Sequence, residues 1–321
     1  MSIARRTFLS LAAAGCLAGM APATASADEI VKVAIGQKGL WDTMVTTHGI
    51  EEGFFKKEGL DVQITWTKGG AETLQAVATG SAAFAMANGM LGVLGAYSKG
   101  AAVRIVSAQM TGAPDLFWYS KADSGIKSLK DSNGKTMGFS RPGSSTNLVA
   151  LELANASGAK PKLTPTGGIS GTRTQVLSGQ IDIGWSVPPF GLDLVNKGEL
   201  HVVARGSDLP KLSDQTIRVN VVNADFLAKK RDVATKFMRV YAQTVDWMYK
   251  NMDATVKRYA AFNKLDAGIA RNSAKFYPRN AVAPSPIKGL DLSVQQAIAY
   301  KKLKKPLSKA QLTELVQILH N

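Results

Sequence analysis

Cysteine and histidine are scarce in this chain of 321 residues. Its one cysteine, Cys16, excludes an internal disulfide framework and any cysteine-rich zinc or iron–sulfur site. The three histidines, His48, His201 and His320, are scattered and form no H-x-x-x-H or H-E-x-x-H metal pattern. The sequence also lacks a G-x-S-x-G nucleophile elbow, a Walker A loop and a G-x-G-x-x-G dinucleotide fingerprint. We therefore expect no catalytic residues, no bound metal and no cofactor.

Acidic residues are also few. The chain has 24 Asp and Glu against 39 Lys and Arg, which gives a formal net charge of +15. Such an excess suggests a nucleic acid, a membrane or an anionic small molecule as partner. We expect no nucleic acid, because the basic residues are not focused on a recognisable binding module. The hydrophobic content of 45% excludes a disordered chain, and the length suits one large domain or two smaller ones.

The first 27 residues have the pattern of an export signal. Arg5 and Arg6 precede a short apolar run, and the small-residue sequence A-S-A ends at Ala27. The run is too short to span a bilayer, which takes roughly 20 residues. The sequence R-R-T-F-L that starts at Arg5 resembles the twin-arginine export motif. An ordinary general-pathway signal that happens to hold two arginines is the alternative.

Cleavage after Ala27 would leave a mature protein without cysteine, and we expect it in the periplasm. Its net charge would be +13, because the 27 residues hold two arginines and no acid (15 minus 2). Cys16 follows a weak lipoprotein-like sequence in which Ala13 stands where leucine is usual, so lipid anchoring is the less favoured alternative. No other long uncharged apolar run occurs in the chain.

Beyond residue 27, short apolar runs alternate with helical stretches, which predicts an α/β protein with mainly parallel sheets. Two stretches share one layout, a glycine pair, a helix, a glycine and a strand; they run from Gly69 to Ala85 and from Gly167 to Gly184. Similar periods can arise by chance, but the shared order favours two related lobes. We expect lobe I over residues 28–112 and 213–321, and lobe II over residues 113–212. Hinges would fall near residues 112–114 and 209–210.

The most informative segment for function is Gly143, Ser144, Ser145 and Thr146, which follows a predicted strand and precedes a predicted helix. Glycine there lets the backbone come close, free N–H groups point outward, and the helix dipole favours an anion. Three consecutive hydroxyls add donors for a carboxylate, sulfonate or phosphate. The alternative is that one of these residues simply caps the helix.

Further candidate ligand-binding residues follow from one rule, that ligands of open parallel sheets lie outside the carboxyl ends of the strands. Aromatic side chains at that place would give a cleft apolar walls, and a guanidinium beside a helix start would attract an anion. The candidates are Gln37, Trp41, Asn88, Gly89, Arg173, Trp185 and Pro189.

Three segments carry a family resemblance. They are I-E-E-G-F-F-K-K-E-G-L-D-V at 50–62, the glycine-pair stretch at 69–80, and L-S-G-Q-I-D at 177–182. With these segments the chain resembles the solute-binding proteins of ABC importers of the nitrate, sulfonate and taurine group, across essentially its mature length. The resemblance implies a two-lobed Venus-flytrap fold of type II that closes on a ligand by hinge motion. It also implies delivery of that ligand to an ABC permease in the inner membrane.

The resemblance implies a cleft lined by residues 37–42, 88–89, 143–146 and 185–189, and a small organic anion as ligand: a sulfonate, a taurine-like compound, a carboxylate or nitrate. Asp42 departs from the family pattern, because a carboxylate facing the cleft would repel an anion. We expect a monomer without enzymatic activity. Two alternatives stay open, an exported enzyme and a binding protein related to the thiamine-pyrimidine synthases. Those synthases use histidine and cysteine chemistry, which the absence of cysteine from the mature chain disfavours.

Overall fold

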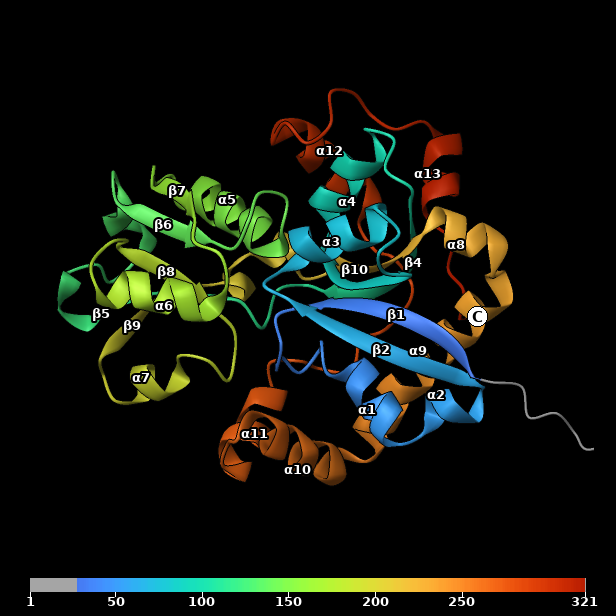
Figure 1. Cartoon of the computed structure of the whole chain (residues 1–321). Coiled ribbons are helices and arrows are strands. Elements are labelled where there is room, and N and C mark those ends of the chain that lie inside the picture. The colour runs from blue at the N-terminus through green and yellow to red at the C-terminus, as the bar shows by residue number, and fades with distance from the viewer. Residues whose placement is uncertain (1–27, 321) are drawn as a thin grey trace, which may run out of the picture.

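The computed structural model describes residues 28–320, which form two lobes, each built around a five-stranded sheet (Figure 1). The predicted export signal and Cys16 lie outside the described residues. Helices and strands alternate in both lobes, so the α/β, two-lobed fold predicted from the sequence is confirmed. None of the helices within residues 28–320 is long and apolar enough to cross a membrane.

Lobe I holds both ends of the described chain. Its strands are β1 (Glu29–Gly36), β2 (Leu60–Thr67), β3 (Phe84–Gly89), β4 (Val103–Thr111) and β10 (Thr216–Asn223). Its helices are α1 (Val45–Glu51), α2 (Phe54–Lys57), α3 (Gly70–Ala78), α4 (Met90–Tyr97), α8 (Ala224–Lys229), α9 (Arg231–Lys250), α10 (Met252–Asn263), α11 (Ala267–Ala274), α12 (Leu290–Ala299) and α13 (Lys309–Leu315).

Lobe II is a single continuous segment, drawn in green and yellow in Figure 1. Its strands are β5 (Phe117–Lys121), β6 (Thr136–Phe139), β7 (Lys162–Pro165), β8 (Ile183–Ser186) and β9 (Leu200–Arg205). Its helices are α5 (Ser145–Ser157), α6 (Ile169–Leu177) and α7 (Leu192–Asn196), with short 3₁₀ turns at Ala122–Ser124, Leu129–Ser132, Gly206–Asp208 and Pro210–Leu212.

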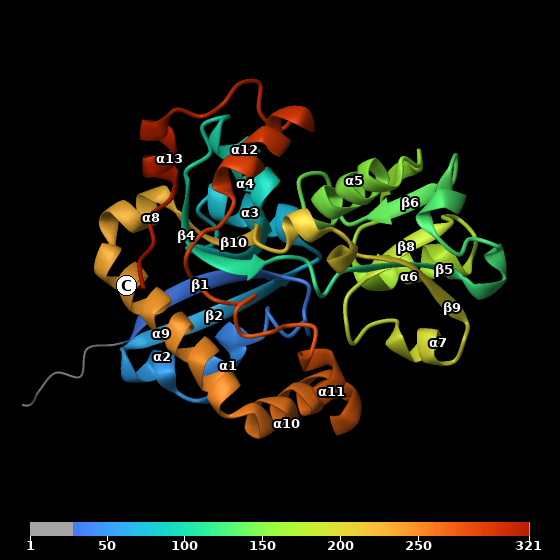
Figure 2. The same ribbon diagram turned by 180° about the vertical axis from the view of Figure 1, so that it is seen from behind.

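The two sheets have equivalent strand orders, β2-β1-β3-β10-β4 in lobe I and β7-β6-β8-β5-β9 in lobe II. In each sheet four strands share one direction, and the fifth, β10 or β5, is antiparallel to both of its neighbours. This antiparallel strand is the first element to join a sheet after the chain crosses from the other lobe (Figures 1 and 2). Each crossing therefore leads into the inside of a sheet rather than to its edge.

The repeat in the sequence corresponds to the same structural corner in both lobes. In lobe I the hydroxyls of Thr67 and Thr73 lie 2.7 Å apart, and in lobe II those of Thr166 and Thr172 lie 2.7 Å apart. Each pair joins the end of a strand to the first turn of the helix that follows it. The helical partner of each pair also donates to the carbonyl of the residue four positions earlier, a glycine in both lobes.

Two long helices predicted from the sequence are each divided in the structure. Residues 42–58 form α1 and α2, separated by Gly53, whose φ of 71° lies in the left-handed region that a helix cannot continue through. Residues 225–251 form α8 and α9, separated by Lys230, which has φ −138° and ψ 47°. The capping box predicted at Ser308 and Gln311 is present and starts α13.

A buried histidine lies in α1. The ring of His48 is fully buried and packs 6.4 Å from the ring of Trp247, and neither ring nitrogen has a hydrogen-bond partner. Burial lowers the pKa of His48 from 6.5 to about 4, and the nearby positive charge of Arg258 adds to this effect. The carboxylate of Glu51, 3.6 Å from Nδ1, does not offset these two effects.

This histidine should make the protein sensitive to acid. Between pH 6.5 and about 4 the unfolded chain binds a proton at His48 that the folded chain does not, so the free energy of unfolding falls as the pH falls. The loss between pH 7 and 4.5 is about 2–3 kcal/mol. In urea titrations over this range, His48→Leu should lose less stability than the wild type by that amount. His201→Leu, at an exposed position, is the control and should keep the wild-type dependence; equal pH dependence in His48→Leu would contradict the assignment.

Candidate functional site

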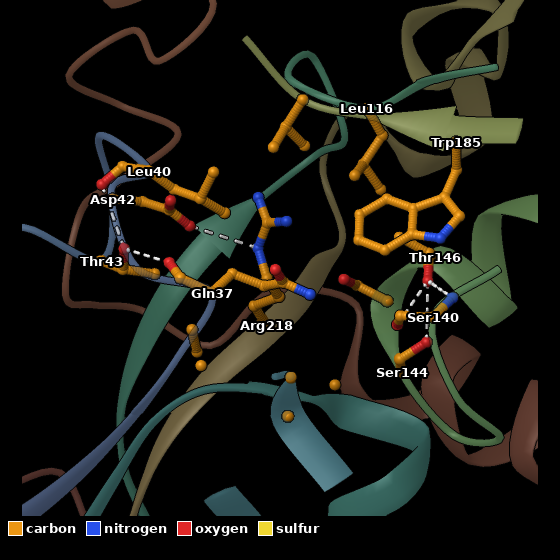
Figure 3. A pocket seen from close by; sticks show the side chains of 17 residues that line it. Gln37, Leu40, Asp42, Thr43, Leu116, Ser140, Ser144, Thr146, Trp185 and Arg218 are labelled. Atoms are coloured by element: carbon orange, nitrogen blue, oxygen red, sulfur yellow. Dashed lines mark hydrogen bonds and ion pairs between the residues drawn. The ribbon is translucent and has the colours of Figure 1, made fainter. Parts of the chain in front are cut away.

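A small cavity lies between the two lobes, at the carboxyl ends of their parallel strands (Figure 3). Its volume is about 40 Å³, which is space for a few water molecules or a small ligand. Its walls come from both lobes and from the crossing between β4 and β5. The lining residues are Gly36, Gln37, Leu40, Asp42, Thr43, Gly69, Gly70, Ala87, Gly89, Leu116, Ser140, Ser144, Ser145, Thr146, Trp185, Val187 and Arg218.

The lobe I wall contains two residues in an uncommon backbone conformation. Gln37, just after β1, has φ 56°, and Ala87, in β3, has φ 61°. Left-handed φ is unfavourable for residues other than glycine and is found where the surrounding structure enforces it, often at functional sites. Here Gln37 is held by a hydrogen bond from its Nε2 to the carbonyl of Lys68, and the Ala87 N–H donates to Oδ1 of Asn220.

The charged part of the site is a buried cluster of two carboxylates and one guanidinium. Arg218 of β10 donates from Nη2 to Oδ2 of Asp115 at 2.6 Å, and its Nε lies 3.5 Å from Oδ2 of Asp42. Gln109 of β4 donates to the same Asp42 oxygen at 2.6 Å. The side chains of Asp42, Asp115 and Arg218 are at most 6% exposed. With all three ionised, the cluster carries one net negative charge.

Burial dominates the acidity of this cluster. It raises the pKa of the Asp115 carboxyl to about 6; the guanidinium of Arg218 opposes that rise, and the negative charge of Asp42 adds to it. For Arg218, burial favours the neutral form, but the attraction of Asp115 and Asp42 outweighs it and raises the pKa above its ordinary value. Arg218 therefore stays charged and holds the two acids together.

The lobe II wall is the start of α5. Ser144 is the N-cap, and its Oγ accepts a hydrogen bond from the N–H of Asn147. The hydroxyl of Thr146 accepts from the N–H of Ser140 and contacts the hydroxyls of Ser140 and Ser144. Ser145 takes no part in this network, and the N–H groups of Ser145 and Thr146 come before the first hydrogen bond that the helix can form with itself. The wall thus presents donors without acceptors of their own.

Several contacts hold the lobes together around the cavity. The N–H of Gly92 in α4 donates to the carbonyl of Gly143 at 2.9 Å. Arg141 of lobe II forms an ion pair with Glu72 of α3. Glu152 of α5 accepts hydrogen bonds from Gln296 and Tyr300 of lobe I. The structure is therefore that of two lobes in contact around a small enclosed space.

The structure brings together part of the residue set predicted from the sequence. Those that line the cavity are Gln37, Gly89, Ser144, Ser145, Thr146 and Trp185. Those outside its lining are Trp41, Asn88, Gly143, Arg173 and Pro189. Asn88 is fully buried, and its Nδ2 donates to the carbonyl of Ala85, which fixes the backbone of β3. Gly143 contributes to the contact between the lobes, and Pro189 follows Pro188 through a cis peptide bond.

The expectation that Trp41 faces the cleft opposite Trp185 is corrected by the structure. Trp41 is fully buried inside lobe I, where it packs edge-on against Tyr249 and Tyr259 with ring centres 6.4 and 5.1 Å away. Its Nε1 donates to the hydroxyl of Tyr249. A large aromatic ring is stabilised more by this core than by a small polar cavity, so the apolar wall comes from Trp185 with Leu40, Leu116 and Val187.

Sequence reasoning did not find Arg218, Asp115 or Ala87. A signal for Arg218 was available, because it is a charged residue inside the apolar strand predicted at 217–222, and a buried charge requires a partner. Asp42 was noted only as a departure from the family pattern, and it does line the cavity. Within residues 28–320, no group of three His, Cys, Asp or Glu side chains is placed to hold a metal ion.

The fold and the cavity define a two-lobed solute-binding protein. A family model described as NMT1/THI5 like matches residues 44–255, which is more than half of the chain. The chain belongs to this family. No curated protein matches it by sequence alone.

Solved structures share the fold at low sequence identity. The alkanesulfonate-binding protein SsuA from Xanthomonas axonopodis pv. citri, bound to MOPS, has a TM-score of 0.75 at 15% identity, over 91% of this chain and 100% of that one. The periplasmic nitrate-binding protein NrtA from Synechocystis PCC 6803 has a TM-score of 0.72 at 14% identity, over 89% and 84%. The desulfurization enzyme DSZB has a TM-score of 0.63 at 13% identity, over 88% and 96%. The fold therefore serves binding proteins and an enzyme.

Removing the guanidinium should destabilise the protein strongly. Arg218→Met leaves Asp42 and Asp115 buried without a counter-charge, which costs about 3–5 kcal/mol of unfolding free energy at pH 7. The loss should shrink towards pH 4.5, because the folded variant then binds protons at these carboxyls more readily than the unfolded chain does. Arg239→Met, which breaks a largely exposed pair with Glu58, is the control and should cost less than about 1 kcal/mol. A loss that stays the same at both pH values would contradict this account.

Proposed function

We propose that this protein is the extracytoplasmic solute-binding component of an ABC importer and that it binds a small organic anion between its lobes. The observation that supports this most directly is the cavity wall at the start of α5. Two backbone N–H groups and the Ser145 hydroxyl face a space that both lobes enclose. Helix starts favour anions through these N–H groups and through the helix dipole.

The ligand class and the transport role rest on different observations. The donors at α5 suit a sulfonate, a carboxylate or nitrate, and related folds include alkanesulfonate-binding and nitrate-binding proteins. We propose that an ABC permease in the inner membrane receives the ligand, that the binding protein acts as a monomer in the periplasm, and that cleavage after Ala27 removes a twin-arginine export signal. The export pattern in the first 27 residues and the family membership support these proposals.

Ligand capture follows from the two crossings between the lobes. The chain passes between them at residues 112–116 and 206–215, so bending at these segments moves lobe II as a unit relative to lobe I. We propose residues 28–112 with 213–321, and 113–212, as the moving units. An anion bound at α5 would be enclosed when Gly143 meets α4.

A binding role is favoured over catalysis by the chemistry of the lining. Among the described residues that line the cavity, Asp42 and Arg218 are the ionisable ones, and they are paired with each other. Neither histidine nor cysteine occurs in that lining. A group that hydrolyses or transfers part of a substrate would need a free acid, base or nucleophile at this place.

Loss of the Ser145 hydroxyl should weaken anion binding without loss of helix capping. Thermal shift and calorimetry with methanesulfonate, acetate and nitrate identify the anion class, since a ligand that binds only the folded state raises the melting temperature. For the anion that binds, Ser145→Ala should raise the Kd by about 5- to 150-fold, which corresponds to roughly 1–3 kcal/mol for a hydrogen bond to a charged group. Ser157→Ala, at the far end of α5, is the control. An unchanged Kd in Ser145→Ala would remove the anion from this helix start.

A methyl group at Gly89 should prevent the lobes from closing. The backbone of Gly89 has φ −65° and ψ 129°, which alanine adopts freely, but a Cβ there would lie 2.5 Å from the Gly143 carbonyl and 2.7 Å from the Ser145 nitrogen across the cavity. Gly89→Ala should therefore keep wild-type stability without ligand and lose ligand-induced compaction in small-angle X-ray scattering. Gly171→Ala, where a Cβ makes only an ordinary contact at 3.6 Å, is the control. Full compaction in Gly89→Ala would contradict the closure model.

A further inference from the structure

The cavity has an excess of buried acceptors on its lobe I side. Oδ1 of Asp42, Oδ1 of Asp115 and Oε1 of Gln109 are all buried and have no hydrogen-bond partner among the described residues. Their parent residues are at most 3% exposed. Native proteins pair nearly all buried polar atoms, so three unpaired acceptors within one cluster call for donors from outside the protein.

Asp42 is the member of the cluster that reaches the cavity. It lines the cavity together with Arg218, whereas Asp115 and Gln109 stand behind them (Figure 3). One of its oxygens already receives Gln109 and faces Arg218, and the other receives no donor. A carboxylate oxygen in this condition binds an ammonium or another N–H donor well.

The net charge supports the same conclusion. One guanidinium stands against two carboxylates, so the cluster does not present a spare positive charge to an anion. Arg218 is engaged by an acid on two sides, through Nη2 and Nε. An anion approaching this side of the cavity would meet a net negative charge, and a cation would be attracted to it.

The opposite side of the cavity has the reverse polarity. The start of α5 supplies N–H donors and the Ser145 hydroxyl, as described above. The cavity is about 40 Å³, so one small molecule fills it and contacts both sides at once. A ligand with only an acidic group would satisfy lobe II and leave the Asp42 acceptor unpaired.

We propose that the ligand is a small zwitterion, with an acidic group at the start of α5 and an ammonium group at Asp42, which makes Asp42 the residue that determines specificity. This inference rests on the proposed function, since it assumes that an anionic group binds at α5. It adds the requirement for a second, positively charged group, and it gives a role to a carboxylate that a purely anionic ligand would avoid.

The test compares compounds that differ in the amino group alone. Isothermal titration of the wild type with 2-aminoethanesulfonate against ethanesulfonate, and with 3-aminopropionate against propionate, should show at least a tenfold preference for an amino compound over its partner. Asp42→Asn keeps the Arg218–Asp115 pair and the shape of the side chain, and it should reduce that preference to less than about threefold. Ethanesulfonate should bind this variant at least as well as it binds the wild type.

A second variant separates direct contact from general charge. Asp115→Asn removes one negative charge from the same cluster, but its side chain does not line the cavity, so most of the preference for the amino compound should remain. If Asp115→Asn removes the preference as completely as Asp42→Asn does, direct recognition by Asp42 is wrong. Thermal unfolding of both variants establishes that they are folded before binding is measured.

The outcomes also distinguish this inference from the proposed function. If ethanesulfonate or propionate binds the wild type as tightly as its amino partner, the zwitterion is excluded while anion binding at α5 stands. If none of the four compounds, nor methanesulfonate, acetate or nitrate, binds the wild type, the anion-binding function itself is overturned, and this inference with it.

Discussion

The contact between Arg218 and the two carboxylates is the interaction on which the architecture of the site depends. Asp42 comes from the loop after β1, Arg218 from β10, and Asp115 from the crossing between the lobes. One guanidinium thus ties the first cleft loop and the hinge to a strand inside the lobe I sheet. Buried ion pairs are seldom favourable against apolar packing, and they persist where position matters more than stability. Here the position that is fixed is that of the hinge relative to the cavity.

The likeness of the two lobes explains why the cavity lies where it does. Both sheets have the same strand order, and both carry a threonine pair at the corner between a strand and its helix. Facing two such sheets places two sets of strand ends on one space, which is the place for ligands in open α/β sheets. The lobes differ in charge, however, because the acids of the cavity lie in lobe I and its free donors in lobe II. A symmetric scaffold therefore encloses an asymmetric space.

Sequence patterns predicted the fold well because they depend on local regularities. Alternating strands and helices, the repeated glycine pair and the capping box at Ser308 all arise from periodicity or turn chemistry. The helix start at Ser144 was predicted for the same reason, and it lines the cavity as expected. Both readings of its three hydroxyls hold in part, because Ser144 caps the helix and Ser145 stays outside that network.

Pairings between distant segments could not be predicted in this way. Asp42, Asp115 and Arg218 are separated by 73 to 103 positions, and the pairing of a buried charge depends on which strands become neighbours. The strand order that places β10 between β3 and β4 has no local signature in the sequence. Trp41 shows the same limit, since its neighbours Tyr249 and Tyr259 come from helices more than 200 positions away. The side that a residue after a strand faces is decided by those partners.

The close approach of Gly89 and Gly92 to Gly143 has a consequence for how the protein signals that it is loaded. Backbone meets backbone at this place, so no side chain can bend aside to admit a larger guest. A molecule too large for the cavity would hold the lobes apart at these glycines and leave the hydrogen bond between Gly92 and Gly143 unformed. The distance between α4 and α5 is then a gauge of ligand size. A partner that contacts both lobes could read it without touching the ligand.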